Sequence, residues 1–265
     1  MALTFQHKPG LVAYITCGDP DLETSREVIH AAIRAGADVI ELGVPFSDPV
    51  ADGPVIQRAS ERALHAGTTL RSVLKLASEI RQQEPQVGLL VFSYLNPLVR
   101  FGLENFAVEA RLAGVDGVLV TDLPVEEAAE HLEIMRKHQV DTVFLAAPTS
   151  PDKRLKGICD ASRGFVYAVS RTGITGTRQE VAADASGLVK RIKQFTKLPV
   201  AVGFGISNAQ QFAEVTSFAD AAVVGSGIVQ VIEQAGRGKA AAKAVHEFIT
   251  RLLLGTRQSA QSTTK

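Results

Sequence analysis

Short runs of aliphatic and β-branched residues alternate with amphipathic stretches along almost the whole chain. Such runs, bounded by Gly, Pro or Asp, predict buried strands. The stretches between them repeat their apolar positions with the period of a helix. The strands are expected at residues 11–17, 38–43, 87–93, 117–121, 141–146, 164–169, 199–203 and 221–224. The helices are expected at residues 22–36, 54–84 with a break at Gly67, 103–113, 124–138, 151–161, 184–196, 207–217 and 238–253.

Eight strands that alternate with helices within 265 residues define the expected architecture. A (β/α)8 barrel needs about 250 residues and this same alternation, so we predict an α/β fold of the TIM-barrel type. A doubly wound sheet is the alternative, although such sheets commonly have fewer strands. No linker rich in Gly, Ser or Pro divides the chain, so residues 1–254 are expected to form one catalytic domain. Residues 255–265 are polar and are expected to form a disordered C-terminal tail.

The overall composition argues against several classes of protein. Apolar residues make up 46% of the chain, and 28 basic residues balance 28 acidic ones, which gives a pI near 7.0. Neither a nucleic-acid-binding face nor a polybasic membrane patch is therefore indicated. No apolar run approaches the ~20 residues that a membrane-spanning helix requires, and no secretory signal is evident at the N-terminus. Cys17 and Cys159 stand far apart, which is typical of reduced thiols in a cytoplasmic protein.

One carboxylate lies within an otherwise apolar strand. In the run 38–46, Glu41 occupies the same face of the expected strand as Val39 and Gly43. A buried acid can be structural if it pairs with a basic residue, but the interiors of the expected strands hold no Lys or Arg. An unpaired carboxyl group in the mouth of a barrel has a raised pKa and can exchange protons near neutral pH. Glu41 is therefore the first candidate for an acid/base residue.

A second acid, Asp52, follows eleven residues later in a loop rich in Pro and Asp. Asp52 comes just before Gly53–Pro54 and could instead cap the N-terminus of the helix that follows. Asp48 is explained equally well by turn chemistry, and Asp122 by the start of a helix. Tyr167, on the sixth expected strand, either packs in the core or presents its hydroxyl group at the mouth.

Two glycine-rich segments follow the last two expected strands, at residues 203–207 and 225–227. Glycines allow backbone N–H groups to approach an anion closely, and a helix that starts beside them adds the positive end of its dipole. Barrels commonly bind phosphate at these two loops, although the glycines could simply form tight turns. The loop at 170–178 also has two glycines and could be a lid over a phosphorylated substrate or only a flexible surface loop.

Residue types that other reactions require are absent from the expected strand ends. No Lys is placed to form a Schiff base, and no cluster of His and Asp is placed to bind a metal. The chain has neither a Gly-x-Ser-x-Gly nucleophile motif nor the Gly-x-x-x-x-Gly-Lys-Ser/Thr motif of nucleotide-binding proteins. The pattern therefore favours metal-free acid/base chemistry on a phosphorylated small molecule.

Together these motifs resemble the α subunit of tryptophan synthase. The run 41–54 (Glu-Leu-Gly-Val-Pro-Phe-Ser-Asp-Pro-Val-Ala-Asp-Gly-Pro) is similar to the most specific signature of that family. Five further matching segments occur in order, at residues 18–20, 121–127, 170–176, 203–207 and 224–229. The resemblance extends over about residues 11–254, and chance agreement across so many ordered motifs is implausible.

The resemblance implies a lyase of tryptophan biosynthesis that cleaves indole-3-glycerol phosphate to indole and glyceraldehyde 3-phosphate. It makes Glu41 the general acid/base and Asp52 the acceptor for the indole N–H group, and it places the Tyr167 hydroxyl group near Glu41 and the substrate. The implied phosphate-binding residues are Gly176, Gly205, Gly225 and Ser226. The implied lid residues are Arg171 and Thr175, of which Thr175 also approaches the substrate. The implied lining of the indole pocket is Tyr14, Leu90, Phe92, Leu119 and Ile228.

The family works with a β subunit that carries pyridoxal phosphate and joins indole to serine. The resemblance therefore implies an α2β2 heterotetramer through which indole passes, with no cofactor and no metal on this chain. Asp48, Pro49 and the segment after residues 93–97 would face the partner. Two alternatives remain. One is a lyase that releases free indole without a partner, and the other is a barrel that has lost catalysis and serves as an allosteric binding partner.

The chain differs from many members of the family in two respects. Only residues 1–10 precede the first expected strand, so a helix that commonly covers the barrel floor is missing and the floor must be closed differently. Tyr14 occupies a position often held by Phe, and Phe92 one often held by Tyr. A hydroxyl group has therefore moved within the expected pocket, which could alter the fit of the substrate.

Overall fold

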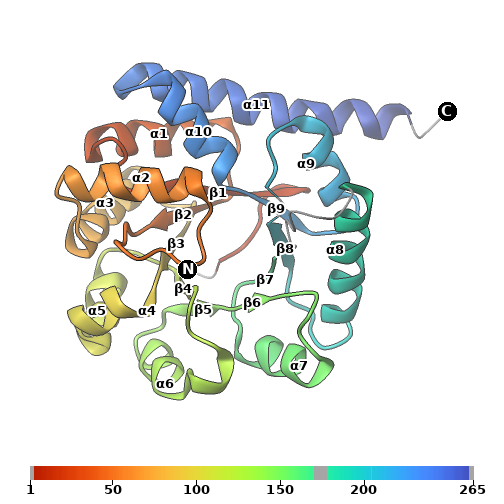
Figure 1. The fold of residues 1–265 in the computed structure, drawn as a ribbon, viewed down its shortest axis with the longest axis horizontal. Helices are drawn as coiled ribbons and strands as arrows, with labels where there is room; N and C mark the ends of the chain where they lie inside the picture. Colours follow the sequence, from red (N-terminus) through yellow and green to blue (C-terminus); the bar gives the residue numbers. More distant parts are fainter. Residues whose placement is uncertain (1–2, 170–177, 204, 263–265) are drawn as a thin grey trace.

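The computed structural model describes the backbone of residues 3–169, 178–203 and 205–262 (Figure 1). Within these residues the strands pair in parallel, in the order β5-β4-β3-β2-β1-β9-β8-β7-β6. Helices surround the strands on the outside (Figure 1). The strands are β1 (Gly10–Thr16), β2 (Val39–Gly43), β3 (Gly88–Ser93), β4 (Gly117–Val120), β5 (Asp141–Val143), β6 (Leu145–Ala146), β7 (Val166–Val169), β8 (Val200–Gly203) and β9 (Ala221–Val224).

The nine strands found in the described residues correspond to the eight expected ones, because the fifth is interrupted. β5 and β6 are separated in the chain by Phe144 alone, yet they lie at the two ends of the strand order. The N–H group of Tyr167 on β7 donates to the carbonyl oxygen of Phe144 at 3.2 Å. The segment 141–146 therefore closes the ring, and the predicted (β/α)8 barrel is confirmed.

Eight of the helices in the described residues follow strands and cover the barrel, and three others are additions to this repeat. The covering helices are α1 (Leu22–Ala35), α3 (Leu70–Gln83), α5 (Leu103–Leu112), α6 (Ala129–Lys137), α7 (Asp152–Ala161), α8 (Arg178–Ile192), α9 (Ala209–Thr216) and α11 (Gly238–Ser262). The additional helices are α2 (Pro54–His65), α4 (Leu95–Phe101) and α10 (Ser226–Ala235). None of the helices described is both long and apolar enough to cross a membrane.

Several helix boundaries differ from the prediction. The expected break within residues 54–84 is confirmed. The sequence does not predict α4, because Asn-Pro near its start looks like a loop. A helix start beside the glycines at 225–227 was expected, and α10 begins at Ser226. The expected helix 124–138 begins as a short 3-10 helix, η1 (Val125–Glu127). The last helix continues to Ser262, into the segment expected to be a disordered tail. Its Gln, Arg and Ala residues favour a helix, and Gly255 does not end it.

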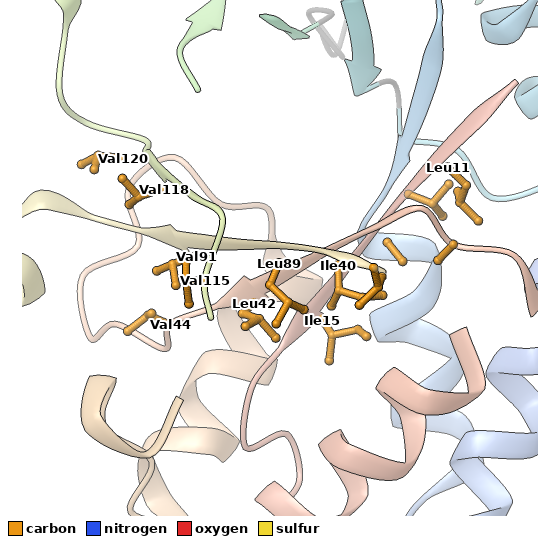
Figure 2. Close-up of a cluster of buried hydrophobic side chains, with 14 of the residues drawn as sticks. Leu11, Ile15, Ile40, Leu42, Val44, Leu89, Val91, Val115, Val118 and Val120 are labelled. Carbon is orange, nitrogen blue, oxygen red and sulfur yellow. The ribbon is translucent and has the colours of Figure 1, made fainter. Parts of the chain in front are cut away.

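Two apolar layers follow from the alternation of side chains along each strand. Ile40 and Leu42 of β2 point outward into the layer between the strands and the helices, which Figure 2 shows together with Leu89 of β3. Val39 points inward, into a second cluster that fills the barrel. Because side chains alternate along a strand, Glu41 shares the inward face of Val39. Glu41 is also 1% exposed and in register with Leu90 of the same inner cluster, which agrees with the predicted orientation.

The floor of the barrel is closed by the extended N-terminal arm. Leu3 is 1% exposed and belongs to the cluster that fills the barrel. The ring of Phe5 packs on that of Phe165, with 5.5 Å between the ring centroids. A Cβ atom on Gly164 or Gly117 would lie only 2.6 or 2.7 Å from the Leu3 side chain. These glycines therefore leave the space that Leu3 fills at the floor of the barrel.

Candidate active site

Glu41 lies in β2 with its side chain directed into the barrel. It is 1% exposed, and neither of its carboxylate oxygens has a hydrogen-bond partner among the described residues. Burial penalises the charged form and raises the pKa of the Glu41 carboxyl group to about 8. Among the residues described, no basic side chain pairs with it, so the structural alternative for Glu41 is not supported.

Strand register places Glu41 between Tyr14 of β1 and Leu90 of β3. Residues in register on neighbouring parallel strands point to the same face of a sheet. Leu90 packs in the inner cluster with Leu119 of β4, whereas Tyr14 belongs to a small cluster at the mouth. Phe92, two residues beyond Leu90 on β3, contacts both clusters. The acid therefore has an apolar wall on one side and an aromatic ring on the other.

Two tyrosine hydroxyl groups lie at the mouth because glycines leave room for them. The Tyr14 hydroxyl oxygen is 2.5 Å from the place where a Cβ atom on Gly43 would be. The Tyr167 hydroxyl oxygen is 2.7 Å from the corresponding place on Gly203. Gly43 ends β2 and Gly203 ends β8, so each ring leans over the end of a neighbouring strand. Tyr167 was expected either to pack in the core or to present its hydroxyl group at the mouth. Its position supports the second interpretation.

The negative charges of Glu41 and Asp52 raise the pKa of the same two tyrosines, Tyr14 and Tyr167. Burial raises the pKa of the Tyr14 hydroxyl group well above its usual value, and the negative charges of Asp52 and Glu41 raise it further. Burial also raises the pKa of Tyr167, and here the charge of Glu41 contributes more than that of Asp52. Tyr14 is also the neighbour of Glu41 in strand register. The charges of both acids therefore bear on the two tyrosine hydroxyl groups at the mouth.

Asp52 is held by a tyrosine that the sequence analysis did not identify. The hydroxyl group of Tyr94 donates to Oδ2 of Asp52 at 3.2 Å and accepts from the N–H group of Ala51 at 2.9 Å. Burial raises the pKa of Asp52 to about 6, and the hydrogen bond from Tyr94 opposes this shift. Asp52 is not the cap of α2, because the N-cap residue is Gly53 and no side chain caps this helix. A signal in the sequence was available, since Tyr94 directly follows the third strand at the edge where such residues meet.

The aromatic side of the pocket consists of Tyr14 and Phe92. Their rings meet edge to face, with 5.1 Å between centroids and an angle of 77° between planes. Val229 of α10 packs in the same small cluster as Tyr14. Ile228, expected in this lining, is fully buried in the outer layer between the strands and the helices. The described contacts therefore place Val229, rather than Ile228, beside Tyr14.

Three of the four expected phosphate-binding residues, Gly205, Gly225 and Ser226, lie at the loops after β8 and β9. Ser226 is the first residue of α10, and among the described residues no side chain caps this helix at Gly225. The first N–H groups of a helix have no partner within it and carry partial positive charge. A Cβ atom on Gly227 would lie 2.7 Å from the carbonyl oxygen of Ile206, so the two loops touch here. Gly205 has a φ of 61° and is exposed.

Three expected residues fall outside the described part of the chain. They are Arg171, Thr175 and Gly176 of the expected lid. The arrangement of the remaining ones defines a class: a (β/α)8-barrel protein with buried carboxyl groups at the carboxyl ends of the strands, where barrel enzymes have their active sites, and with the start of a helix beside them.

Comparisons with known proteins identify the family within this class. The family model for the tryptophan synthase alpha chain matches residues 1–256. The chain is 49% identical over 250 residues to the tryptophan synthase alpha chain of Solibacter usitatus, covering 94% of this chain and 93% of that one. It is 48% identical over 251 residues to that of Burkholderia lata, covering 95% and 92%.

Solved structures agree with these sequence matches. The tryptophan synthase alpha subunit of Legionella pneumophila has a TM-score of 0.86 and 33% identity, with 94% of this chain and 93% of that one covered. A chain of the tryptophan synthase complex of Pyrococcus furiosus has a TM-score of 0.84 and 38% identity, with 96% and 99% covered. The chain belongs to the tryptophan synthase alpha chain family. It is thus a carbon–carbon lyase of tryptophan biosynthesis that cleaves indole-3-glycerol phosphate.

Proposed function

We propose that Glu41 and Asp52 carry out the cleavage of indole-3-glycerol phosphate to indole and glyceraldehyde 3-phosphate. The observation that supports this most directly is the buried, unpaired carboxyl group of Glu41, beside Tyr14 in strand register. A pKa of about 8 keeps Glu41 protonated at neutral pH, as a general acid requires.

The reaction uses two proton transfers at one carboxyl group. Glu41 first donates its proton to C3 of the indole ring, which becomes an indolenine with positive charge at N1. The Glu41 carboxylate then accepts the proton of the hydroxyl group on the carbon attached to C3. The bond between C3 and that carbon breaks, and its electron pair restores the indole ring. The hydroxyl oxygen becomes the aldehyde oxygen of glyceraldehyde 3-phosphate, and Glu41 is protonated again.

Asp52 stabilises the positive charge that forms on the ring. Its carboxylate accepts a hydrogen bond from the indole N–H group, and this interaction strengthens as N1 becomes cationic. A pKa of about 6 leaves Asp52 mostly ionised at neutral pH. The two acids therefore have the opposite protonation states that their roles require, because Glu41 is buried without a partner and Asp52 receives a hydrogen bond.

The remaining residues bind the two ends of the substrate. Gly205, Gly225 and Ser226 hold the phosphate at the start of α10, and Gly176 joins them from the lid that includes Arg171 and Thr175. The Tyr167 hydroxyl group contacts the glycerol chain near Glu41. The indole ring lies against Tyr14, Leu90, Phe92 and Leu119, with Ile228 behind this wall.

We also propose a β-subunit partner in an α2β2 assembly. The partner holds pyridoxal phosphate, and this chain binds neither cofactor nor metal. The tryptophan synthase structures of Mycobacterium tuberculosis and Pyrococcus furiosus contain chains similar to this one. The loop before α2 suits such a contact, since Val50 is 86% exposed beside Asp48 and Pro49. The free, buried thiol groups of Cys17 and Cys159 suit a cytoplasmic location.

An assay of indole release from indole-3-glycerol phosphate tests the roles of the two acids. Glu41→Gln keeps the shape of the side chain but not its proton transfer, so cleavage should be lost while affinity for inorganic phosphate stays within about threefold of wild type. Asp52→Asn should lower turnover without abolishing it. Full activity of Glu41→Gln would refute the proposal, and equally slow cleavage by wild type and variant would favour a binding protein without catalysis.

The same assay with and without a β subunit tests the partner. A subunit of a complex should turn over faster when its partner is present. Near-full activity of the isolated chain would favour a lyase that releases free indole. Sedimentation of the mixture then establishes the stoichiometry.

A further inference from the structure

The two additional helices α2 and α10 pack against each other at the mouth of the barrel. Each is inserted between a strand and the covering helix that follows it, α2 after β2 and α10 after β9 (Figure 1). A small apolar cluster lies beneath them, in which Ala59 of α2 and Val229 of α10 contact Tyr14. The start of α2 follows Asp52 directly, and the start of α10 is Ser226. The two helices therefore begin at opposite ends of the proposed substrate site.

A group of ion pairs joins these helices. Glu233 of α10 accepts from Nε of Arg58 at 3.1 Å and from Nη2 at 3.0 Å. It also accepts from Nη1 of Arg62 at 2.7 Å. Arg62 in turn donates to both carboxylate oxygens of Asp19, at 2.7 and 2.9 Å. Two arginines of α2 are thus balanced by one acid on α10 and one in the loop after β1.

The geometry of these contacts fixes α2 in two directions. Asp19 is 1% exposed and follows β1, so its bidentate pair with Arg62 fastens α2 to the barrel. Glu233 has a side chain that is 30% exposed, and its three hydrogen bonds fasten α2 to α10. A helix is stiff, so holding Arg58 and Arg62 also holds the residues just before α2. Asp52 is one of these residues.

We propose that Arg58, Arg62 and Glu233 are positioning residues for catalysis. They set the distance between Asp52 and the phosphate-binding start of α10, so that one substrate molecule reaches both. The inference rests on the proposed roles of Asp52 and Ser226. Catalysis then depends on the distance between Asp52 and the start of α10 as well as on each of them. A displacement of about 1 Å between reacting groups can cost a large factor in rate.

A positioning role and a purely stabilising role predict different changes in melting temperature when Glu233 is replaced. Exposed ion pairs contribute about 0–1 kcal/mol to folding, so loss of the Glu233 charge should change the melting temperature little. A change in the relative position of two helices, in contrast, acts directly on a substrate that spans them. Inorganic phosphate, which needs only the start of α10, should bind as before.

The decisive variant is Glu233→Gln, with Glu109→Gln as a matched control. Glu109 of α5 also accepts two hydrogen bonds from one arginine, Arg71, at 3.0 and 3.1 Å, but it lies outside the substrate site. We expect Glu233→Gln to lower kcat/KM for indole-3-glycerol phosphate about tenfold. Phosphate affinity should stay within about twofold, and both variants should melt within about 3 °C of wild type. Glu233→Asp, which keeps the charge, should recover part of the loss.

Three results would overturn the inference. One is a kcat/KM for Glu233→Gln within twofold of wild type. Another is an equal loss in the Glu109→Gln control, and the third is a parallel loss of phosphate affinity or of melting temperature, which would indicate general disruption. If wild type itself released no indole, the proposed function would fail and this inference with it. An active wild type with an unaffected Glu233→Gln would remove the inference alone.

Discussion

The hydroxyl oxygen of Tyr14 lies 2.5 Å from the point where a Cβ atom on Gly43 would be placed. Its ring atoms Cζ and Cε2 are almost as close to that point, at 2.6 and 2.8 Å. Any side chain at residue 43 must therefore push the ring away from the end of β2. Because Tyr14 also lies beside Glu41 in strand register, the glycine at residue 43 bears on the shape of the catalytic pocket.

Gly43→Ala is predicted to damage both stability and catalysis. The added methyl group overlaps a buried ring, which commonly costs about 1–3 kcal/mol. Displacement of the ring into the pocket should lower kcat/KM by at least about tenfold. Chemical denaturation and indole release measure the two effects.

Gly187→Ala provides the control, because nothing lies within 4 Å of a Cβ atom at that position of α8. Its effect on stability should be zero or slightly favourable, as alanine suits a helix better than glycine. A Gly43→Ala variant as stable and active as Gly187→Ala would contradict the account of the tyrosine.

Replacement of Glu41 should change how stability depends on pH. The carboxyl pKa rises from 4.5 to about 8 on folding, because burial penalises the charge. Between these two values the folded protein keeps a proton that the unfolded chain has lost, so wild-type stability falls as pH rises through this window. Glu41→Gln has no such proton, and its stability relative to wild type should increase by on the order of a few kcal/mol between pH 5 and pH 8.

Urea denaturation of both proteins at several pH values measures this difference. The pH-dependent part of the difference should vanish below about pH 4, where the carboxyl group is protonated in the folded and the unfolded chain alike. A difference that stays constant across the whole range would show that Glu41 is not buried without a partner.

Tyr94 should set the pH at which kcat/KM rises on the acidic side of its pH profile. If Asp52 must be ionised and Glu41 protonated, kcat/KM should rise near pH 6 and fall near pH 8. The hydrogen bond from Tyr94 lowers the pKa of Asp52, so its removal should move the rising side to higher pH. Tyr94→Phe should therefore lose activity about three- to tenfold at pH 6 and less at pH 7.5.

Measurement of kcat/KM from pH 5 to pH 9 tests this prediction, with the falling side near pH 8 as an internal reference. Loss of activity by the same factor at every pH would point instead to a displaced loop, since the Tyr94 hydroxyl group also holds the N–H group of Ala51.

Leu3 should stabilise the barrel without taking part in catalysis. Its side chain is buried among inner residues such as Val39 and Phe165, and truncation of such a leucine costs about 2–5 kcal/mol. Leu3→Ala should therefore lower the melting temperature markedly while kcat at 25 °C changes less than about twofold. Leu112→Ala, at a position that is 79% exposed, should leave the melting temperature nearly unchanged. Equal melting temperatures for the two variants would mean that the arm does not close the floor.

The sequence by itself determined the features that depend on local periodicity. Alternation along a strand has a period of two residues, so the inward direction of Glu41 followed from its apolar neighbours. The number of β/α units followed from the same patterns, and the family resemblance added the roles of Asp52 and the glycine loops. The interruption of the fifth strand at Phe144 and the short helix α4 were missed, because their residues have no distinct local pattern.

Only the tertiary structure decided which distant residues meet. The contact between Tyr94 and Asp52 joins two loops, and the contact between Arg62 and Glu233 joins residues 171 positions apart. The closure of the floor by Leu3 likewise depends on glycines more than a hundred residues away. Such contacts arise when strands close into a ring and bring their ends to one rim, and no spacing along the chain encodes them directly.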